Sequence, residues 1–233
     1  MTSSSVDLVL LPGLWLPGSV WDPVVERLAE AGLTAVAPSL PGVDLAGPAT
    51  LDDQLEAVLR VVDAAGSPVV VGHSAASGLA WLVADRRPDG VRRVVLVGGF
   101  PSADGDTYAD LFPVVDGGMP FPGWEPFEGA DAFDLDDAAR SALAATTVPV
   151  PAGVSQAVVH LHDERRYEVP VTLVCPEFSA AEARGWVRDG DLPELARATD
   201  LTLVDVDSGH WPMVTRPAEL AALLAAAAAP ARG

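Results

Sequence analysis

Residues 68–78 read PVVVGHSAASG, and this stretch decides the fold. Its three consecutive valines are typical of a buried strand, and the apolar residues from Ala75 to about Arg86 are typical of a helix. A tight turn between a strand and a helix lifts its central side chain, here that of Ser74, above the edge of the sheet. Such a turn requires small residues two positions on either side, where this chain has glycine and alanine. The stretch therefore predicts a serine nucleophile on a strand-turn-helix unit.

The alternation of strand and helix continues on both sides of this stretch. Strand patterns lie at 6–11, 34–37, 68–72, 91–97, 169–175 and 201–205. Helix patterns lie at 22–31, 51–65, 75–86, near 180–187, around 192–198 and at 217–229. Strands and helices that alternate in this way form a parallel sheet with helices on both faces. We expect an α/β fold with a mostly parallel, doubly wound sheet.

Residues 101–167 interrupt the alternation. They are rich in Pro, Gly, Asp and aromatic residues, contain no strand pattern, and favour helices only at 136–145 and 153–160. So long a segment without core elements is typical of a functional lid rather than of a second core. We expect residues 1–100 and 168–233 to form the core and residues 101–167 to form a lid.

The general base must come from another part of the chain, because a serine hydroxyl needs a neighbouring group to take its proton. His210 follows the last expected strand, so its loop belongs to the same sheet edge as Ser74. It is the candidate base. His73 is expected to point into the structure, and His160 and His162 are expected at the surface of the lid. No His-Glu-x-x-His spacing occurs, so no metal site is expected.

Taken together, these motifs resemble the α/β-hydrolase superfamily, and more loosely its compact branch of plant methylesterases and hydroxynitrile lyases. The resemblance covers nearly the whole chain: LLPGLW (10–15), WDPV (21–24), PSLPG (38–42), the serine turn and SGH (208–210). It implies the hydrolase fold and no cofactor. It also implies that the backbone N–H groups of Leu14 and Ala75 form an oxyanion hole, which stabilises negative charge on a carbonyl oxygen.

The chain departs from the pattern of this superfamily near the active-site loops. Pro12 stands where members commonly have histidine before Gly13, and Ala76 stands where glycine is usual. Members also place an aspartate a few residues past the strand corresponding to 169–175, where this chain has Ser179.

The acid of the expected triad is therefore open. Glu177 is the nearest carboxylate to the usual position, and its extra methylene could extend its reach to His210. Asp104, after the strand at 91–97, is the alternative, and Asp106 is a weaker one. A third reading makes Glu177 only a turn residue, since a triad without its acid keeps part of its rate enhancement.

Aromatic residues near these positions are candidates for the substrate pocket. Trp15 follows the expected oxyanion donor, and Trp211 follows the expected base. Trp124 and Phe121 belong to the lid, where the aromatic side chains either pack against the core or line an apolar pocket above Ser74.

Composition narrows the range of partners. The net charge is −19, and all fourteen basic residues are arginine, so nucleic acid and anionic membranes should be repelled. No apolar run is long enough to span a membrane, and no secretory signal pattern is present. The single cysteine, Cys175, excludes an intramolecular disulfide. We expect a cytoplasmic enzyme acting on a small molecule, as a monomer or homodimer.

The sequence therefore predicts a serine hydrolase that cleaves a small carboxylic ester, thioester or lactone through an acyl-enzyme on Ser74. Acyl transfer or lactone formation at the same site is an alternative if the lid excludes water. A ligand-binding protein that keeps the fold without turnover is the alternative from another class.

Overall fold

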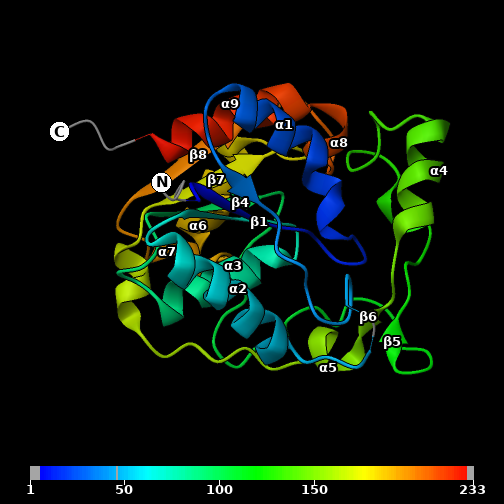
Figure 1. The fold of residues 1–233 in the computed structure, drawn as a ribbon, viewed down its shortest axis with the longest axis horizontal. Helices are drawn as coiled ribbons and strands as arrows, with labels where there is room; N and C mark the ends of the chain where they lie inside the picture. The colour runs from blue at the N-terminus through cyan, green and yellow to red at the C-terminus, as the bar shows by residue number, and fades with distance from the viewer. Residues whose placement is uncertain (1–5, 46, 230–233) are drawn as a thin grey trace, which may run out of the picture.

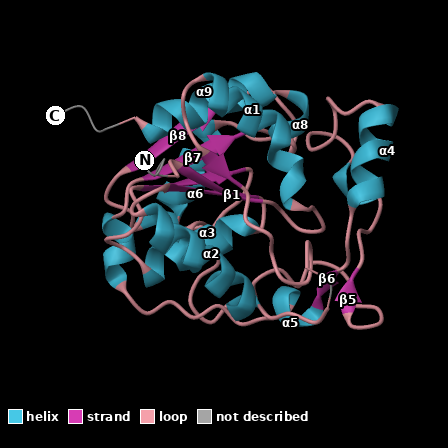
Figure 2. Cartoon of the chain, in the orientation of Figure 1, coloured by secondary structure: helices cyan, strands magenta, loops and turns pink. Residues whose placement is uncertain are grey.

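A computed structural model of the protein describes residues 6–45 and 47–229. Within these ranges the main sheet has six strands in the order β2-β1-β3-β4-β7-β8. Every strand pairing in this sheet is parallel, as the doubly wound fold predicts. Figure 2 shows the sheet with helices on both sides. The outermost parts of the expected core, residues 1–5 and 230–233, lie outside the described residues.

The strands of the main sheet are β1 (Leu8–Leu11), β2 (Ala35–Val36), β3 (Val69–His73), β4 (Arg93–Val97), β7 (Val171–Cys175) and β8 (Leu201–Asp205). The chain passes from β1 outward to β2 and then returns to β3 on the opposite side of β1. The strand order therefore reverses between β1 and β3. Ligands of open α/β sheets bind at the carboxyl ends of the strands beside such a reversal.

Two groups of helices cover the two faces of the sheet (Figure 1). One face carries α1 (Asp22–Glu30), α8 (Pro212–Thr215) and α9 (Pro217–Ala228). The other carries α2 (Leu51–Ala65), α3 (Ala76–Arg86), α6 (Ala180–Asp189) and α7 (Pro193–Ala196). Short 3-10 helices occupy Gly18–Trp21, Glu125–Phe127 and Glu164–Glu168. None of the described helices is long and apolar enough to cross a membrane.

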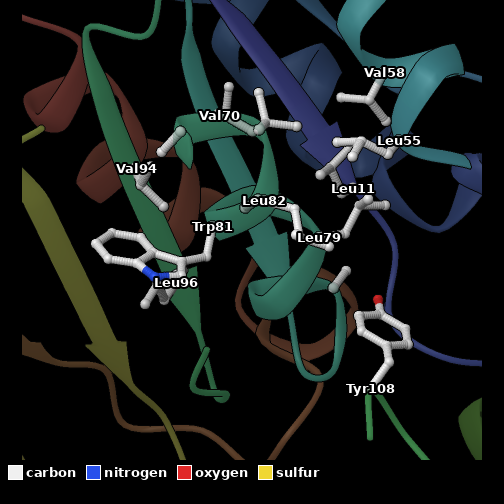
Figure 3. Packing of buried hydrophobic residues seen from close by; sticks show 14 of the residues in the cluster. Leu11, Leu55, Val58, Val70, Leu79, Trp81, Leu82, Val94, Leu96 and Tyr108 are labelled. Atoms are coloured by element: carbon white, nitrogen blue, oxygen red, sulfur yellow. The ribbon is translucent and has the colours of Figure 1, made fainter. Parts of the chain in front are cut away.

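Alternating side chains of the strands supply the core on each face. Val9 and Leu11 belong to the cluster under α2 and α3, whereas Leu8 and Leu10 belong to the cluster under α1 and α9. This alternation follows from the two-residue period of a strand. Figure 3 shows the first cluster, in which Leu11 packs near helix residues such as Leu79. Both faces of the sheet are thus buried, and the site can form only at an edge or an end.

The inserted segment (residues 101–167) joins β4 to β7 and differs in part from the expected structure. It contains α4 (Asp137–Thr146), near the expected helix, and α5 (Ala152–Ser155). It also contains two short antiparallel strands, β5 (Gly118–Met119) and β6 (Val150–Pro151), where none was expected. The expected helix at 153–160 is wrong beyond residue 155, because the following backbone pairs with an earlier loop. Val158 forms a bridge with Thr107, and the Tyr108 N–H donates to the Ala157 carbonyl at 2.8 Å.

Three hydrogen bonds hold the inserted segment against loops at the carboxyl end of the sheet. The Trp15 indole N–H donates to the Met119 carbonyl (3.0 Å), and the Val148 N–H donates to the Trp15 carbonyl (2.8 Å). The His210 N–H donates to the Asp131 carbonyl (2.7 Å). The segment thus contacts the loops that follow β1 and β8.

Candidate active site

Ser74 occupies a tight turn between β3 and α3, in a backbone conformation that is rare outside glycine. Its φ is +55°, a left-handed value that costs about 1–3 kcal/mol and persists only where the surroundings impose it. A Cβ atom at Gly72 would lie 2.3 Å from the Ala76 carbonyl oxygen, and one at Gly99 would lie 2.2 Å from the Ser74 carbonyl oxygen. The turn is therefore held between closely packed backbone segments. Its side chain remains partly exposed at the end of the strand.

His210 and Glu177 form a hydrogen-bonded pair. The His210 Nδ1 atom lies 2.7 Å from Glu177 Oε1, and their side chains are 13% and 14% exposed. Because a carboxylate accepts, Nδ1 of the neutral ring carries the hydrogen in this pair. Nε2 then has a free lone pair that can accept a proton. This is the tautomer that a general base needs.

The end of β4 lies against both the base and the nucleophile. A Cβ atom at Gly98 would lie 3.3 Å from His210 Nδ1, and one at Gly99 would lie 2.8 Å from the Cα atom of Ser74. Within the described part of the chain, no hydrogen bond joins Ser74 to His210. Such hydrogen bonds are often long in free enzymes and shorten when substrate binds.

His73 supports the loop that carries His210. It is 1% exposed, so it points inward as expected, and its Nε2 atom lies 2.7 Å from the His210 carbonyl oxygen. Burial lowers the pKa of His73 to about 3, with a smaller contribution from the neighbouring His210. The ring is thus neutral near pH 7, and Nε2–H is the donor because a carbonyl oxygen only accepts. His73 holds the backbone of His210 in position.

The structure brings Glu177 to the base and leaves the other two candidate acids elsewhere. Asp104 Oδ1 accepts a hydrogen bond from the Leu161 N–H at 2.9 Å, and Asp106 Oδ2 accepts one from the Ala103 N–H at 3.2 Å. Both carboxylates therefore stabilise loops of the inserted segment. Of the three candidate carboxylates, Glu177 is the one that contacts His210 among the described residues.

Ser179, where the superfamily pattern has its aspartate, serves a different purpose. Its hydroxyl accepts from the Glu182 N–H, and the Glu182 carboxylate accepts from the Ser179 N–H, which forms a capping box at the start of α6. The side chain at 179 is committed to this helix, and the carboxylate that meets His210 comes from two residues earlier.

The two expected oxyanion donors lie close to Ser74. Ala75 directly follows Ser74, and a Cβ atom at Gly13, next to Leu14, would lie 3.2 Å from the Ser74 Cβ. Among the described residues, no hydrogen bond uses the Leu14 or the Ala75 N–H. Trp15 also has a left-handed φ of +65°. The N–H groups of Leu14 and Ala75 are therefore available to a substrate oxygen.

All four expected pocket residues line one cavity. Trp15, Phe121, Trp124 and Trp211 line a narrow cavity of only about 10 Å³, which is partly open to solvent. Successive rings meet edge to face, with centroids 5.6 Å apart for Trp15–Phe121 and 5.2 Å for both Phe121–Trp124 and Trp124–Trp211. The last ring contacts the base, since the His210 and Trp211 centroids are 5.0 Å apart. We call this space the aromatic cavity.

Some neighbours of His210 were not predicted. The inserted segment contributes Asp131, whose carbonyl holds the His210 N–H. Burial raises the pKa of the Asp131 carboxyl; His210 opposes this shift and Glu177 adds to it. No local pattern announces such a contact, because it depends on how the segment folds back over the sheet.

Other reactive side chains do not compete for the role of nucleophile. Cys175 is buried, and burial is the largest of the causes that raise the pKa of its thiol to about 12. A thiol of this kind is not a nucleophile near neutral pH. Among the described residues, no group of three or more His, Cys, Asp or Glu side chains is placed to hold a metal ion.

Comparison with known proteins identifies the family and the fold. The model of the alpha/beta hydrolase family matches residues 8–223. An extracellular alpha/beta-hydrolase from a Paenibacillus species superposes with a TM-score of 0.76 at 18% identity, covering 95% of this chain and 98% of that one. A pyrethroid hydrolase from Sphingobium faniae gives 0.73 at 21% identity, covering 97% and 98%. A methylesterase from Arabidopsis gives 0.74 at 14% identity, covering 95% and 98%.

These matches confirm the fold and the resemblance to plant methylesterases that the motifs predicted. No curated protein matches the sequence. The family model spans the sheet, the serine turn and the loop of His210 in one alignment. The chain belongs to the alpha/beta hydrolase family.

Proposed function

We propose that the protein is a serine hydrolase of small carboxylic esters, with thioesters and lactones as related substrates, and that Ser74 is its nucleophile. The observation that carries this proposal is the 2.7 Å contact between Glu177 Oε1 and His210 Nδ1, beside the strained turn of Ser74. Two similar structures, named as a methylesterase and a pyrethroid hydrolase, support ester chemistry. A small-molecule substrate without a cofactor is part of the proposal.

The first half of the reaction forms the acyl-enzyme. Ser74 Oγ attacks the carbonyl carbon while His210 Nε2 takes the hydroxyl proton. The negative charge moves to the carbonyl oxygen, which the N–H groups of Leu14 and Ala75 stabilise. When the bond between the carbonyl carbon and the alcohol oxygen breaks, the imidazolium of His210 returns the proton to the leaving alcohol.

The second half regenerates the enzyme. His210 takes a proton from a water molecule, and the resulting hydroxide attacks the acyl carbonyl. The carboxylic acid leaves as Ser74 recovers its proton from His210. Glu177 reacts with nothing; it holds the imidazole in the useful tautomer and stabilises its charged form. An alcohol in place of water would give acyl transfer through the same steps.

Hydrolysis of p-nitrophenyl esters of increasing acyl length tests the proposal. The wild type should release nitrophenolate, and Ser74→Ala and His210→Ala should each lower kcat/KM by at least about 10³-fold. His162→Ala, at an exposed histidine of the inserted segment, is the matched control and should stay within about twofold. A wild type that binds these esters but hydrolyses none would favour the non-catalytic alternative.

A further inference from the structure

A turn of the inserted segment lies directly on the loop that carries His210. Residues 128–135 form this turn, which leads into α4 (Figure 1) and which we call the strap. The Asp131 carbonyl of the strap accepts the His210 N–H at 2.7 Å. A Cβ atom at Gly209 would lie 2.2 Å from that carbonyl oxygen and 2.6 Å from Asp134 Oδ1, so the strap and the loop are in close contact. The strap therefore fixes the backbone from which the base projects.

Two buried side chains attach the strap to the core. Ala132 and Leu135 belong to the same hydrophobic cluster as Trp211. Burial of apolar side chains stabilises this attachment, but it is non-directional. These contacts hold the strap against the fold, and by themselves they do not determine where the Asp131 carbonyl points.

Arg140, near the start of α4, supplies directional contacts. Its guanidinium group donates to the carbonyl oxygens of Ala132 (3.0 Å) and Leu135 (3.2 Å), and to the two carboxylate oxygens of Glu128 (2.7 and 3.4 Å). These partners lie on both sides of Asp131 in the sequence. A planar guanidinium group with several fixed donors can bind such a set at once, whereas an ammonium group is a compact point charge. One side chain thus connects the beginning, the middle and the end of the strap.

The hydrogen bonds to the strap backbone are better shielded from water than the ion pair. The side chain of Arg140 is 22% exposed, whereas that of Glu128 is 58% exposed. An exposed ion pair contributes little to stability, because water and salt screen it. Hydrogen bonds from a charged donor to carbonyl oxygens are stronger than those from a neutral donor. Arg140 therefore acts mainly on the backbone of the strap.

Arg140 also contacts the aromatic residues that lead to the base. Its guanidinium carbon lies 5.8 Å from the ring centroid of Trp124, within the range of a cation–π interaction. The rings of Trp124 and Trp211 are 5.2 Å apart, and those of Trp211 and His210 are 5.0 Å apart. The same arginine thus supports His210 through the strap and through a row of rings.

We propose that Arg140 is a positioning residue for the base: it orients the strap so that the Asp131 carbonyl holds His210 at the correct distance from Ser74. The role in catalysis rests on the proposed ester hydrolysis. Within the described part of the chain, no hydrogen bond joins Arg140 to Ser74 or His210, so it takes no part in proton transfer. A base must lie within hydrogen-bond reach of the hydroxyl, and small displacements lower the rate strongly. Loss of Arg140 lowers the rate of the chemical step rather than the affinity for substrate.

Steady-state hydrolysis of p-nitrophenyl acetate tests this role. Arg140→Ala should lower kcat about tenfold and change KM by no more than about threefold, because Arg140 does not line the aromatic cavity. Arg87→Ala is the matched control, since Arg87 binds the Asp63 carboxylate and the Arg86 carbonyl at the end of α3 away from Ser74. Its kcat should stay within about twofold. A loss confined to KM, or an equal loss of kcat in the two variants, would overturn the proposal.

Two further measurements separate the geometry of Arg140 from its charge. Guanidinium chloride at about 20 mM, far below denaturing concentrations, should raise the kcat of Arg140→Ala about threefold, and the same concentration of sodium chloride should not. Arg140→Lys keeps the charge but cannot bind Glu128 and both carbonyl oxygens in one plane, so it should retain less than about half of the wild-type kcat. Full activity in Arg140→Lys, or equal effects of the two salts, would contradict the proposal.

Amide hydrogen exchange tests the proposal without turnover. Peptides that cover the His210 loop should exchange faster in Arg140→Ala than in the wild type, because the His210 N–H loses its fixed acceptor. Exchange in Arg87→Ala should match the wild type, and Arg140→Lys gives the same comparison if Arg140→Ala does not fold. Unchanged exchange in the Arg140 variants would overturn the proposal. If the wild type hydrolyses no ester but exchange of the loop depends on Arg140, the proposed function fails and the link between Arg140 and the His210 loop stands.

Discussion

Two segments at the carboxyl end of the sheet hold their side chains by different means. One is the turn around Ser74, and the other is the loop after β7 that carries Glu177, called here the acid loop. The turn is held by contacts between backbone segments. Gly72 and Gly99 approach their neighbours so closely that a Cβ atom on either would lie 2.2–2.3 Å from a carbonyl oxygen. In the acid loop, Glu177 meets His210 only through the length of its side chain, and its second carboxylate oxygen is buried without a partner among the described residues.

This difference explains why the serine keeps its position in the superfamily pattern, with only Ala76 in place of the usual glycine, whereas the carboxylate does not. Because the serine turn depends on these close backbone contacts, the serine cannot be supplied from a neighbouring position in the sequence. A carboxylate that only needs to contact Nδ1 can come from any nearby position with a long enough side chain. The position of the usual aspartate is free to be Ser179, which caps α6.

The largest effect should follow from a Cβ atom at the turn. Gly99→Ala would place a methyl group 2.2 Å from the Ser74 carbonyl oxygen, against backbone that has no room to move. We expect a loss of more than about 3 kcal/mol of unfolding free energy, or no folded protein, because the clash falls in a packed interior.

Gly185→Ala is the matched control for urea denaturation. Gly185 lies inside α6, where the nearest atom to a new Cβ is a flexible arginine nitrogen 3.8 Å away. Alanine there should stabilise the protein by about 0.5–1 kcal/mol. A Gly99→Ala protein as stable and as active as the wild type would contradict the interlocked turn.

The acid loop should show a large loss of activity with little loss of stability. Glu177→Gln removes the charge and disfavours the useful tautomer of His210, so kcat/KM should fall by about 10³–10⁴-fold in ester hydrolysis. Asp104→Asn is the matched control and should stay within about twofold, because among the described residues the Asp104 carboxylate accepts from the Leu161 N–H and does not contact His210. Equal losses in the two variants would refute the assignment of Glu177.

His73 should make the stability of the site depend on pH. Its pKa is about 3 in the folded protein, against an ordinary value of 6.5 for histidine, so between these values only the unfolded chain binds the proton. Stability from this group is therefore complete above pH 6.5 and declines as the pH falls toward 3, by up to about 1.4 kcal/mol per pH unit.

Urea denaturation of the wild type and of His73→Gln between pH 7 and pH 4 measures this effect. The variant should have the shallower dependence, since glutamine does not titrate. His162→Gln, at an exposed histidine, should follow the wild type. Parallel curves for all three proteins would show that His73 does not couple folding to protonation.

The smallest effect should come from Ser179. Ser179→Ala removes the capping hydroxyl of α6 and should cost about 1 kcal/mol of unfolding free energy without changing kcat/KM. Thr50→Ala, which removes the corresponding cap of α2 far along the chain, should cost a similar amount. A loss of activity confined to Ser179→Ala would indicate that this side chain contributes to the site after all.

Most strands and helices of the core were predicted, because their boundaries depend on residues that are neighbours in the sequence. The helix at 51–65 was predicted to the residue, since Thr50 and Asp53 form a capping box and Gly66 has a φ of +93° at its end. The helix expected at 153–160 failed because the backbone after Ser155 pairs with residues near Tyr108. That pairing is a contact between distant segments, which no local periodicity reports.

The site divides in the same way. Ser74 has a local motif, and the position of His210 follows from the strand order, so the sequence alone could nominate both as candidates. The choice between Glu177 and Asp104 required the actual reach of each side chain. The contact of Asp131 with His210 was not predicted, because it depends on the path of the inserted segment.

The most direct test of the central claim is labelling with a fluorophosphonate, followed by identification of the modified peptide by mass spectrometry. Such a reagent reacts with a serine hydroxyl only where a base activates it and an oxyanion site accepts the phosphoryl oxygen. The wild type should be labelled once, at Ser74, while Ser74→Ala should remain unlabelled and Glu177→Gln should react more slowly. A wild type that resists labelling across neutral pH, or that is labelled at another residue, would contradict the account.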